Sequence, residues 1–334
     1  MTSSDCEGAG EAFRITTDPF EPPLKSNAKH EQFFPSPAYL TVSSQLHLEA
    51  PTHALSRTYT LSPTFRAEPS ATSRHLAEFY MLEAEVAFVS NLDALMDTVE
   101  AGIKTVLRGA LKADTPRGNR ARQNLAVIRK SLAEETAESS GSSDGAASLE
   151  TARQEELATF TDKLFARITY TRALEILRQR HAETPFVFEP TWGAGLQSEH
   201  EKYLAGQVYG GPVFVTDYPR SLKPFYMRVN EANGTSSEAV DRQTVACFDL
   251  LAPGIGELAG GSLREERLGH LIDAIDRAGM QREDYEWYLD LRRYGTVEHG
   301  GWGMGFERFI CWVTGVGNVR DVVAFPRWKG HCRY

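Results

Sequence analysis

Cysteine is scarce in this chain, with four residues among 334, and no two of them have C-x-x-C spacing. Cys6, Cys247, Cys311 and Cys332 are therefore expected to be free thiols of a reducing compartment, and no zinc site is expected. No run of 18 apolar residues occurs, so no membrane-spanning helix is expected. The first residues lack a basic segment followed by an apolar stretch, so no secretory signal is expected.

The two common nucleotide-binding fingerprints are also missing. The chain has no G-x-x-x-x-G-K-[ST] phosphate loop and no G-x-G-x-x-G after a strand. The net charge is −9, whereas a dedicated nucleic-acid binder usually presents a basic face. Any contact with nucleic acid has to rest on local basic patches such as 117–130 and 329–333. The composition, 41% hydrophobic and 24% charged, is ordinary for a globular chain of one large or two modest domains.

One polar loop carries the strongest chemical signal. Residues 59–85 place Arg66, Arg74 and His75 between two segments that are typical of strands. An arginine fork binds oxyanions in a bidentate manner and keeps its charge, so such a loop can present fixed cations to a phosphate. The alternative is a solvated hairpin tip, because charge runs usually face water.

A second run is rich in glycine. Residues 294–312 predict a glycine-rich turn that opens into a buried helix, with Arg308 at the start of the helix. Glycine allows the backbone to approach a ligand closely, and a helix N-terminus favours anions. This signal is weak alone, and it gains weight from the cation-bearing loop.

Together the two runs resemble motifs 2 and 3 of class II aminoacyl-tRNA synthetases of the aspartyl, asparaginyl and lysyl subgroup, and of the asparaginyl family in particular. Further stretches that carry the resemblance follow in the family's order, at 4–11, 39–46, 249–265, 290–295 and 318–327. Strands in runs with helices grouped between them already indicate an α+β fold. The resemblance implies the same class, a catalytic domain with an antiparallel sheet flanked by helices.

Periodicity and turn residues predict the elements along the chain. We expect helices over 93–134 with a break near Pro116, and a disordered insertion at 134–148, because nothing larger than Ala could be buried there. The other expected elements are strands at 38–42, 58–62, 80–87, 213–216, 225–229 and 246–251, helices at 149–168, 171–181, 263–278 and 307–314, and a glycine-rich turn at 253–261.

The resemblance implies which residues bind ATP and a metal ion. Arg66 would contact the α-phosphate and the substrate carboxylate, and Arg308 would lie over the adenine near the γ-phosphate, which makes these two the catalytic cations. Asp249 and Glu257 would hold Mg²⁺, a hard ion that prefers carboxylate oxygens. The full set expected at ATP is Arg66, Glu68, Arg74, His75, Phe79, Glu257 and Arg308, with Phe79 stacked on adenine and Arg74 and His75 on the β- and γ-phosphates.

Amino-acid recognition is implied for four residues. Glu7 and Gln45 match positions that bind the α-ammonium group, and Glu83 and Arg264 match those that meet the side chain. A carboxamide has an acceptor oxygen for Arg264 and two N–H donors for Glu83, whereas an aspartate carboxylate would repel Glu83. The resemblance therefore implies asparagine, ATP and tRNA-Asn as substrates of a ligase.

Some features depart from the family pattern. Leu48 and Leu263 are bulkier or less polar than expected beside the amino-acid pocket. The chain starts shortly before the 4–11 segment, so the family's anticodon-binding barrel and motif 1 helix are expected to be absent, with weakened tRNA use and a weakened homodimer. The compartment is expected to be cytoplasmic, or mitochondrial if a leader has been lost. Two alternatives stay open: a paralogue that transfers the activated amino acid to a small acceptor such as ammonia, and a non-catalytic binding relative.

Overall fold

The computed structural model describes residues 1–3, 12–16, 33–34, 36–69, 72–140, 155–231 and 242–333, with the backbone alone at 135–140. Glu7, one of the two residues expected at the α-ammonium group, lies outside the described residues. Cys6 and residues 141–148 of the predicted insertion lie outside them as well.

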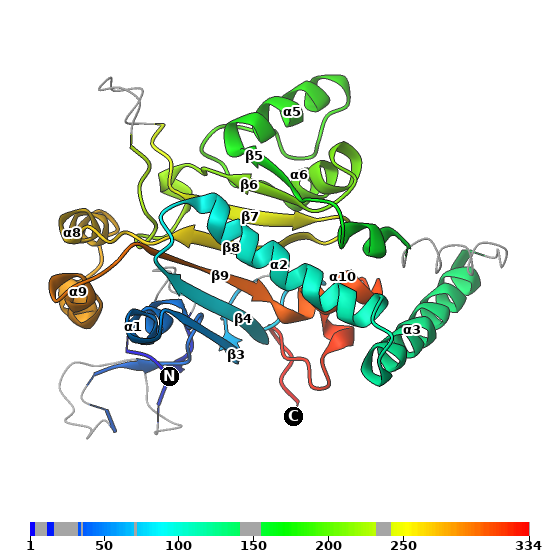
Figure 1. Ribbon diagram of the computed structural model, residues 1–334, viewed down its shortest axis with the longest axis horizontal. Helices are drawn as coiled ribbons and strands as arrows, with labels where there is room; N and C mark the ends of the chain where they lie inside the picture. Colours follow the sequence, from blue (N-terminus) through cyan, green and yellow to red (C-terminus); the bar gives the residue numbers. More distant parts are fainter. Residues whose placement is uncertain are drawn as a thin grey trace.

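A seven-stranded sheet forms the centre of the fold (Figure 1). Its order is β3-β4-β9-β8-β7-β6-β5, and every neighbouring pair is antiparallel except the parallel pair β5–β6. The strands are β3 (Arg57–Phe65), β4 (Glu78–Ala87), β5 (Ala166–Thr169), β6 (Val213–Thr216), β7 (Cys247–Ala252), β8 (Gly256–Leu263) and β9 (His299–Gly305), with a separate small pair β1 (Arg14–Ile15) and β2 (Ala38–Tyr39). The predicted α+β class is confirmed.

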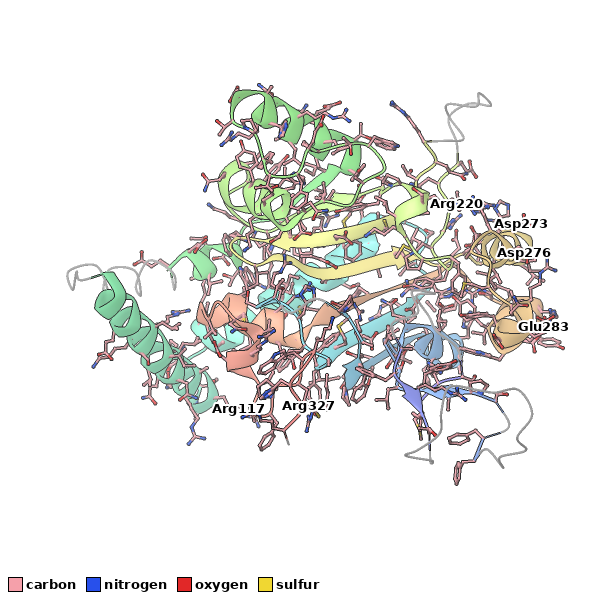
Figure 2. The ribbon with its side chains drawn as sticks, turned by 180° about the vertical axis from the view of Figure 1, so that it is seen from behind. Arg117, Arg220, Asp273, Asp276, Glu283 and Arg327 are labelled. Carbon is pink, nitrogen blue, oxygen red and sulfur yellow. The ribbon has the colours of Figure 1, made fainter. Side chains whose placement is uncertain are left out.

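Helices surround this sheet. In Figure 1 the long helix α2 crosses one face, α8 and α9 lie together at one end, and α5 and α6 lie near β5 and β6. Seen from behind, β7 and β8 lie in front of α2 (Figure 2). The helices are α1 (Gln45–Leu55), α2 (Leu92–Leu111), α3 (Pro116–Ser140), α5 (Tyr170–Glu183), α6 (Ser198–Lys202), α8 (Leu268–Arg277), α9 (Glu286–Arg293) and α10 (Phe306–Thr314). Among the described residues, no helix combines the length and apolarity that crossing a bilayer requires.

Helix α2 forms where the sequence predicts it. Asn91 caps its first turn by accepting a hydrogen bond from the backbone N–H of Ala94. Leu95, Val99 and Leu107 recur at helical spacing and are almost completely buried against the sheet. Burial of such side chains stabilises the fold by roughly 1.5–3 kcal/mol each. This packing holds helix α2 against the apolar face of the sheet.

Strand β4 separates the apolar core from a polar face. Leu82 and Val86 pack toward the core beneath α2, and the alternation of side chains along a strand sends Glu83 and Glu85 to the opposite face. Both carboxylates are nevertheless fully buried, at 0% exposure. Buried charges need partners, so this face of the sheet has to hold cations or strong hydrogen-bond donors.

The predicted glycine-rich turn before α10 is wrong, because residues 299–305 form strand β9 in the middle of the sheet. The glycines there make room for neighbouring side chains. A Cβ at Gly301 would lie 1.7 Å from Oε2 of Glu85, and one at Gly303 would lie 2.8 Å from Cε of Met81. The turn predicted at 253–261 is shorter than expected, because strand β8 already begins at Gly256.

Two expected helices have other boundaries than predicted. The helix expected from Leu263 starts only at Leu268, because Leu263 still belongs to β8. Within the range 149–168, only 155–160 of the described residues are helical, and the end of the range forms β5.

The segment 225–229 makes isolated bridges rather than a strand. Helix α3 continues to Ser140, so the first part of the predicted disordered insertion is helical. Helices α1, α6 and α9 were not predicted.

Candidate active site

A cavity of about 130 Å³ lies between β4, β8, β9, the start of α10 and the loop that follows β3. Its lining includes every residue that the sequence predicts to bind ATP: Arg66, Glu68, Arg74, His75, Phe79, Glu257 and Arg308. Residues from segments almost 250 positions apart therefore meet in one pocket. The two runs that stood out in the sequence both contribute to this lining, and their strands β4 and β9 are paired neighbours in the sheet.

The two predicted catalytic cations are held by fixed partners at the cavity. Arg66 lies 3.9 Å from the carboxylate of Glu68, and its guanidinium carbon lies 5.4 Å from the centre of the Phe79 ring. Arg308 donates to the backbone carbonyl of Glu257 at 3.2 Å and lies 3.7 Å from its carboxylate. Each arginine keeps about a quarter of its side chain exposed, 24% and 28%. The cavity therefore has preorganised positive charge on two sides.

Glu201 of α6 is a site residue that the sequence analysis missed. Its Oε2 accepts a hydrogen bond from the backbone N–H of Glu257 at 3.1 Å and from Nη2 of Arg74 at 3.4 Å. Gly256, at φ +83°, permits this approach, because a Cβ there would lie 2.4 Å from the same oxygen. Glu201 sits on a five-residue helix far from either motif in the sequence, and only the fold reveals its role.

Asp249 and Glu257 converge from neighbouring strands, as a metal site would require. A Cβ on Gly260, which separates them, would lie 3.3 Å from Oδ1 of Asp249 and 3.6 Å from Oε1 of Glu257. Burial and the carboxylate of Glu257 raise the pKa of Asp249, while Lys223, 2.7 Å from both its oxygens, opposes that shift. This donor set fits Mg²⁺, which prefers one or two carboxylates together with substrate phosphates.

Two of the predicted amino-acid residues, Gln45 and Glu83, lie beside Gly303 of this cavity's lining. Gln45 begins α1, and its Oε1 accepts a hydrogen bond of 2.6 Å from the hydroxyl of Tyr226. Glu83 accepts from the hydroxyl of Ser43 and, through both its oxygens, from the backbone N–H of Ser44 at 3.0 and 3.1 Å. Burial raises the pKa of Glu83, and these hydrogen bonds act in the opposite direction. Glu83 is therefore fixed by the loop that leads into α1.

Arg264 is fixed by a carboxylate that sequence analysis did not single out. Its Nε and Nη2 donate to the two oxygens of Glu85 at 2.9 Å each, and its Nη1 donates to the hydroxyl of Ser262 at 2.7 Å. A guanidinium has five N–H groups, so two remain for a ligand oxygen beyond these three bonds. The spacing of Glu83 and Glu85, two residues apart on one strand, is the signal that could have identified Glu85.

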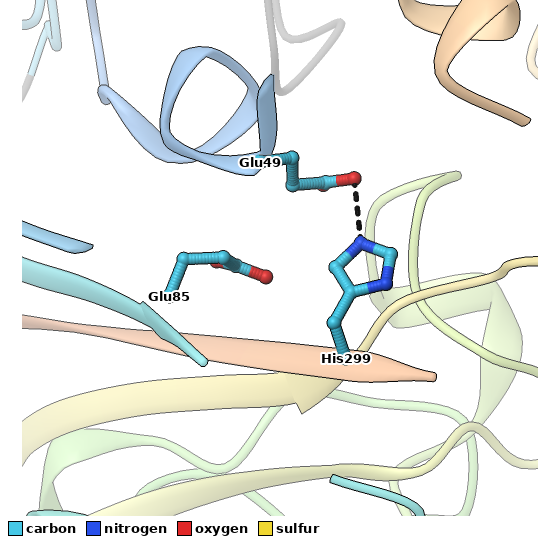
Figure 3. Close-up of side chains that lie close together, drawn as sticks. All are labelled: Glu49, Glu85 and His299. Atoms are coloured by element: carbon cyan, nitrogen blue, oxygen red, sulfur yellow. Dashed lines mark hydrogen bonds and ion pairs between the residues drawn. The ribbon is translucent and has the colours of Figure 1, made fainter. Parts of the chain in front are cut away.

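Behind Arg264, the side chains of Glu49, Glu85 and His299 lie close together (Figure 3). Their ligand atoms fall within 4.8 Å of one another, which is compatible with a metal site. However, Arg264 donates a bidentate pair of hydrogen bonds to Glu85, and Oε2 of Glu49 lies 2.7 Å from Nη1 of Arg292. The two carboxylates are already neutralised by guanidinium groups, so the cluster is an ion-pair network rather than a metal site.

We expect the substitution Gly301→Ala to destabilise the fold by about 3 kcal/mol, because the new methyl group would overlap both Glu85 and Arg264. Gly102→Ala is the matched control. A Cβ at Gly102, on the exposed side of α2, meets nothing within 4 Å, so this change should stabilise the protein by about 1 kcal/mol. Denaturant unfolding of both variants checks the pair, and similar unfolding midpoints would contradict the packing described for β9.

Comparison with known families identifies one that covers almost the whole chain. The family model described as tRNA synthetases class II (D, K and N) matches residues 10–329. The chain therefore belongs to this class II tRNA synthetase family.

Within the family, the chain is similar to asparaginyl enzymes. It is 45% identical to an asparagine–tRNA ligase of Pseudoalteromonas translucida, over 100% of this chain and 65% of that protein. It is 44% identical to an asparaginyl-tRNA synthetase of Mus musculus, over 99% of this chain and 61% of that protein. The crystal structure of the Pyrococcus horikoshii asparaginyl-tRNA synthetase complexed with asparaginyl-adenylate superposes with a TM-score of 0.75 at 31% identity, covering 99% of this chain and 62% of that chain. The chain thus spans a little under two thirds of the relatives that it matches.

Proposed function

We propose that this chain activates asparagine with ATP to form asparaginyl-adenylate and transfers the asparaginyl group to tRNA-Asn. The observation that carries the proposal is the junction of two sites. On one face of β9, Gly303 of the cavity lining lies beside Glu83 and Gly301 lies beside Arg264, and these two buried side chains would suit a carboxamide. The relatives named as asparagine–tRNA ligases support this assignment.

The proposed chemistry is attack by a carboxylate oxygen of asparagine on the α-phosphorus of ATP. A carbon-bound oxygen forms a bond to that phosphorus, while the bond to the β-phosphate oxygen breaks and pyrophosphate leaves with the electron pair. Arg66 would donate hydrogen bonds to the α-phosphoryl oxygens as their charge grows, and Arg74 and Arg308 would hold the departing pyrophosphate. Fixed cations of this kind lower the barrier because they need no reorganisation during the reaction.

The same geometry accounts for the choice of side chain. The two remaining N–H groups of Arg264 would donate to the amide oxygen of asparagine, and Glu83 would accept from the amide nitrogen. Aspartate would place a second negative charge against Glu83 in a buried site, where repulsion is poorly screened. Gln45 would accept from the α-ammonium group, together with Glu7, which remains a prediction.

We propose Mg²⁺ as the metal, held by Asp249 and Glu257. When bound, Mg²⁺ neutralises phosphate charge and orients the oxygens of ATP. Lys223 would keep Asp249 in place through its 2.7 Å contacts.

We expect Asp249→Asn to raise the Mg²⁺ concentration needed for half-maximal activity about tenfold or more, because one anionic ligand is lost. Titration of pyrophosphate exchange with Mg²⁺ measures this shift, and an unchanged midpoint would remove Asp249 from the metal site.

The proposal is tested by measuring ATP–pyrophosphate exchange with asparagine and, in parallel, aminoacylation of tRNA-Asn. Exchange with asparagine together with charging of tRNA-Asn supports both steps. Exchange without charging, combined with transfer to ammonia, would favour the small-acceptor alternative. Intact ATP binding without exchange for any amino acid would favour the non-catalytic alternative.

A homodimer is also part of the proposal. Strand β3 is the edge of the described sheet, and Tyr59, Leu61 and Tyr80 on β3 and β4 expose 78%, 49% and 46% of their surface. Large apolar side chains on a sheet edge favour association with another protein surface.

A further inference from the structure

The ion-pair network behind Arg264 contains a carboxylate that none of the proposed chemistry uses. Glu49 lies on α1 and is fully buried. Its Oε1 accepts a hydrogen bond of 2.6 Å from the hydroxyl of Tyr288 and lies 3.8 Å from Nε of Arg264. Its Oε2 lies 2.7 Å from Nη1 of Arg292 and 2.9 Å from Nε2 of His299. One carboxylate therefore connects α1 with α9, β9 and Arg264, the residue that follows β8.

The charge of Glu49 is maintained by these partners. Burial acts to raise the pKa of Glu49, but Arg292, His299 and Arg264 outweigh it and lower the pKa. The Glu49 carboxylate is consequently ionised, and it compensates the positive charge of Arg264 and Arg292. Glu85 also compensates Arg264, through two hydrogen bonds from its guanidinium.

Helix α1 also connects Glu49 to the ligand groups. Gln45, expected at the α-ammonium group, precedes Glu49 by four residues, which is about one helical turn. The two residues before α1, Ser43 and Ser44, hold Glu83. Glu49 therefore anchors helix α1, which positions one side of the proposed amino-acid pocket. Only the guanidinium of Arg264 would separate Glu49 from the bound amino acid.

We propose that Glu49 is a specificity-determining positioning residue: it anchors Arg264 and Arg292 and cancels part of their charge, so that the pocket accepts a neutral carboxamide and rejects a carboxylate. The inference rests on the proposed function, because it concerns the choice between asparagine and aspartate. Without the negative charge of Glu49, the two guanidinium groups would attract an anionic side chain more strongly. Such interactions are weakly screened in a buried site.

The test is the ratio of kcat/KM for aspartate to kcat/KM for asparagine in pyrophosphate exchange. We expect Glu49→Gln, which keeps the shape and removes the charge, to raise this ratio on the order of tenfold. A purely structural role would lower activity with both amino acids together and leave the ratio unchanged. Glu100→Gln is the matched control, since Glu100 is also buried and paired, with Lys104 on α2, away from the pocket. Its ratio should equal that of the unmodified protein.

A second variant separates charge from packing. Glu49→Gln combined with Arg292→Met removes one charge of each sign, and we expect the ratio to return to within about threefold of the original value. The inference is overturned if folded Glu49→Gln keeps the original ratio, or if the double variant keeps the raised one. If Glu49→Gln does not fold, the double variant is compared with Arg292→Met alone. The inference then requires a higher ratio of kcat/KM for aspartate to kcat/KM for asparagine in the double variant than in Arg292→Met.

The two proposals fail in different ways. A protein that exchanges with no amino acid refutes the proposed function, and the inference with it. Active variants with an unchanged ratio refute the inference alone.

Discussion

Replacing Arg66 by Ala should lower asparagine-dependent pyrophosphate exchange by about a hundredfold or more, equivalent to about 3 kcal/mol of transition-state stabilisation. Arg66 lines the cavity and is held between Glu68 and the ring of Phe79. Its guanidinium is thus preorganised where charge would develop on the α-phosphoryl group. The loss should appear mainly in kcat, because the interaction strengthens in the transition state.

Arg172→Ala provides the control for this experiment. Arg172 lies on α5, is 63% exposed and pairs with Glu175 at the surface. Loss of such a pair costs little stability and should leave exchange unchanged. If Arg66→Ala folds and retains more than about a tenth of the original rate, Arg66 is not the principal cation of the reaction.

Replacing Glu83 by Gln should reduce the discrimination between asparagine and aspartate from about 10⁴ to about 10² or less. A site built to hydrogen-bond a polar group rejects its mismatch by about 10⁴, and Glu83 is the residue that would repel a carboxylate. The glutamine can still accept from Ser44, so the loop before α1 should keep its position. We expect kcat/KM for asparagine to fall about a hundredfold and that for aspartate to stay equal or rise.

Glu78→Gln is the matched variant on the same strand. Glu78 begins β4 and pairs at 2.5 Å with Arg327, which is labelled in Figure 2. That pair is partly exposed and lies outside the cavity lining, so the preference for asparagine should persist. If Glu83→Gln keeps the full preference for asparagine over aspartate, another group recognises the side-chain amide.

The sequence predicted the parts of the fold and site whose signals are local. Helix α2 followed from its apolar spacing, and β4 followed from the strand signal at 80–87. The residues predicted to bind ATP were identified through the family resemblance of three segments, 59–85, 249–265 and 294–312. All seven of them line one cavity.

What the sequence could not reveal depends on contacts between distant segments. The glycines of β9 indicated a turn, but their actual role is to leave space for Glu85 and Met81, which only strand pairing reveals. The hydrogen bond between Glu49 and His299 joins residues 250 positions apart. Glu201 likewise reaches Glu257 from a short helix that has no motif of its own.

The most direct test of the central claim is ATP–pyrophosphate exchange measured separately with each of the twenty amino acids. The account predicts Mg²⁺-dependent exchange with asparagine, at a rate that exceeds that with aspartate by about 10⁴. Equal rates with asparagine and aspartate, or exchange with neither while ATP still binds, would contradict it.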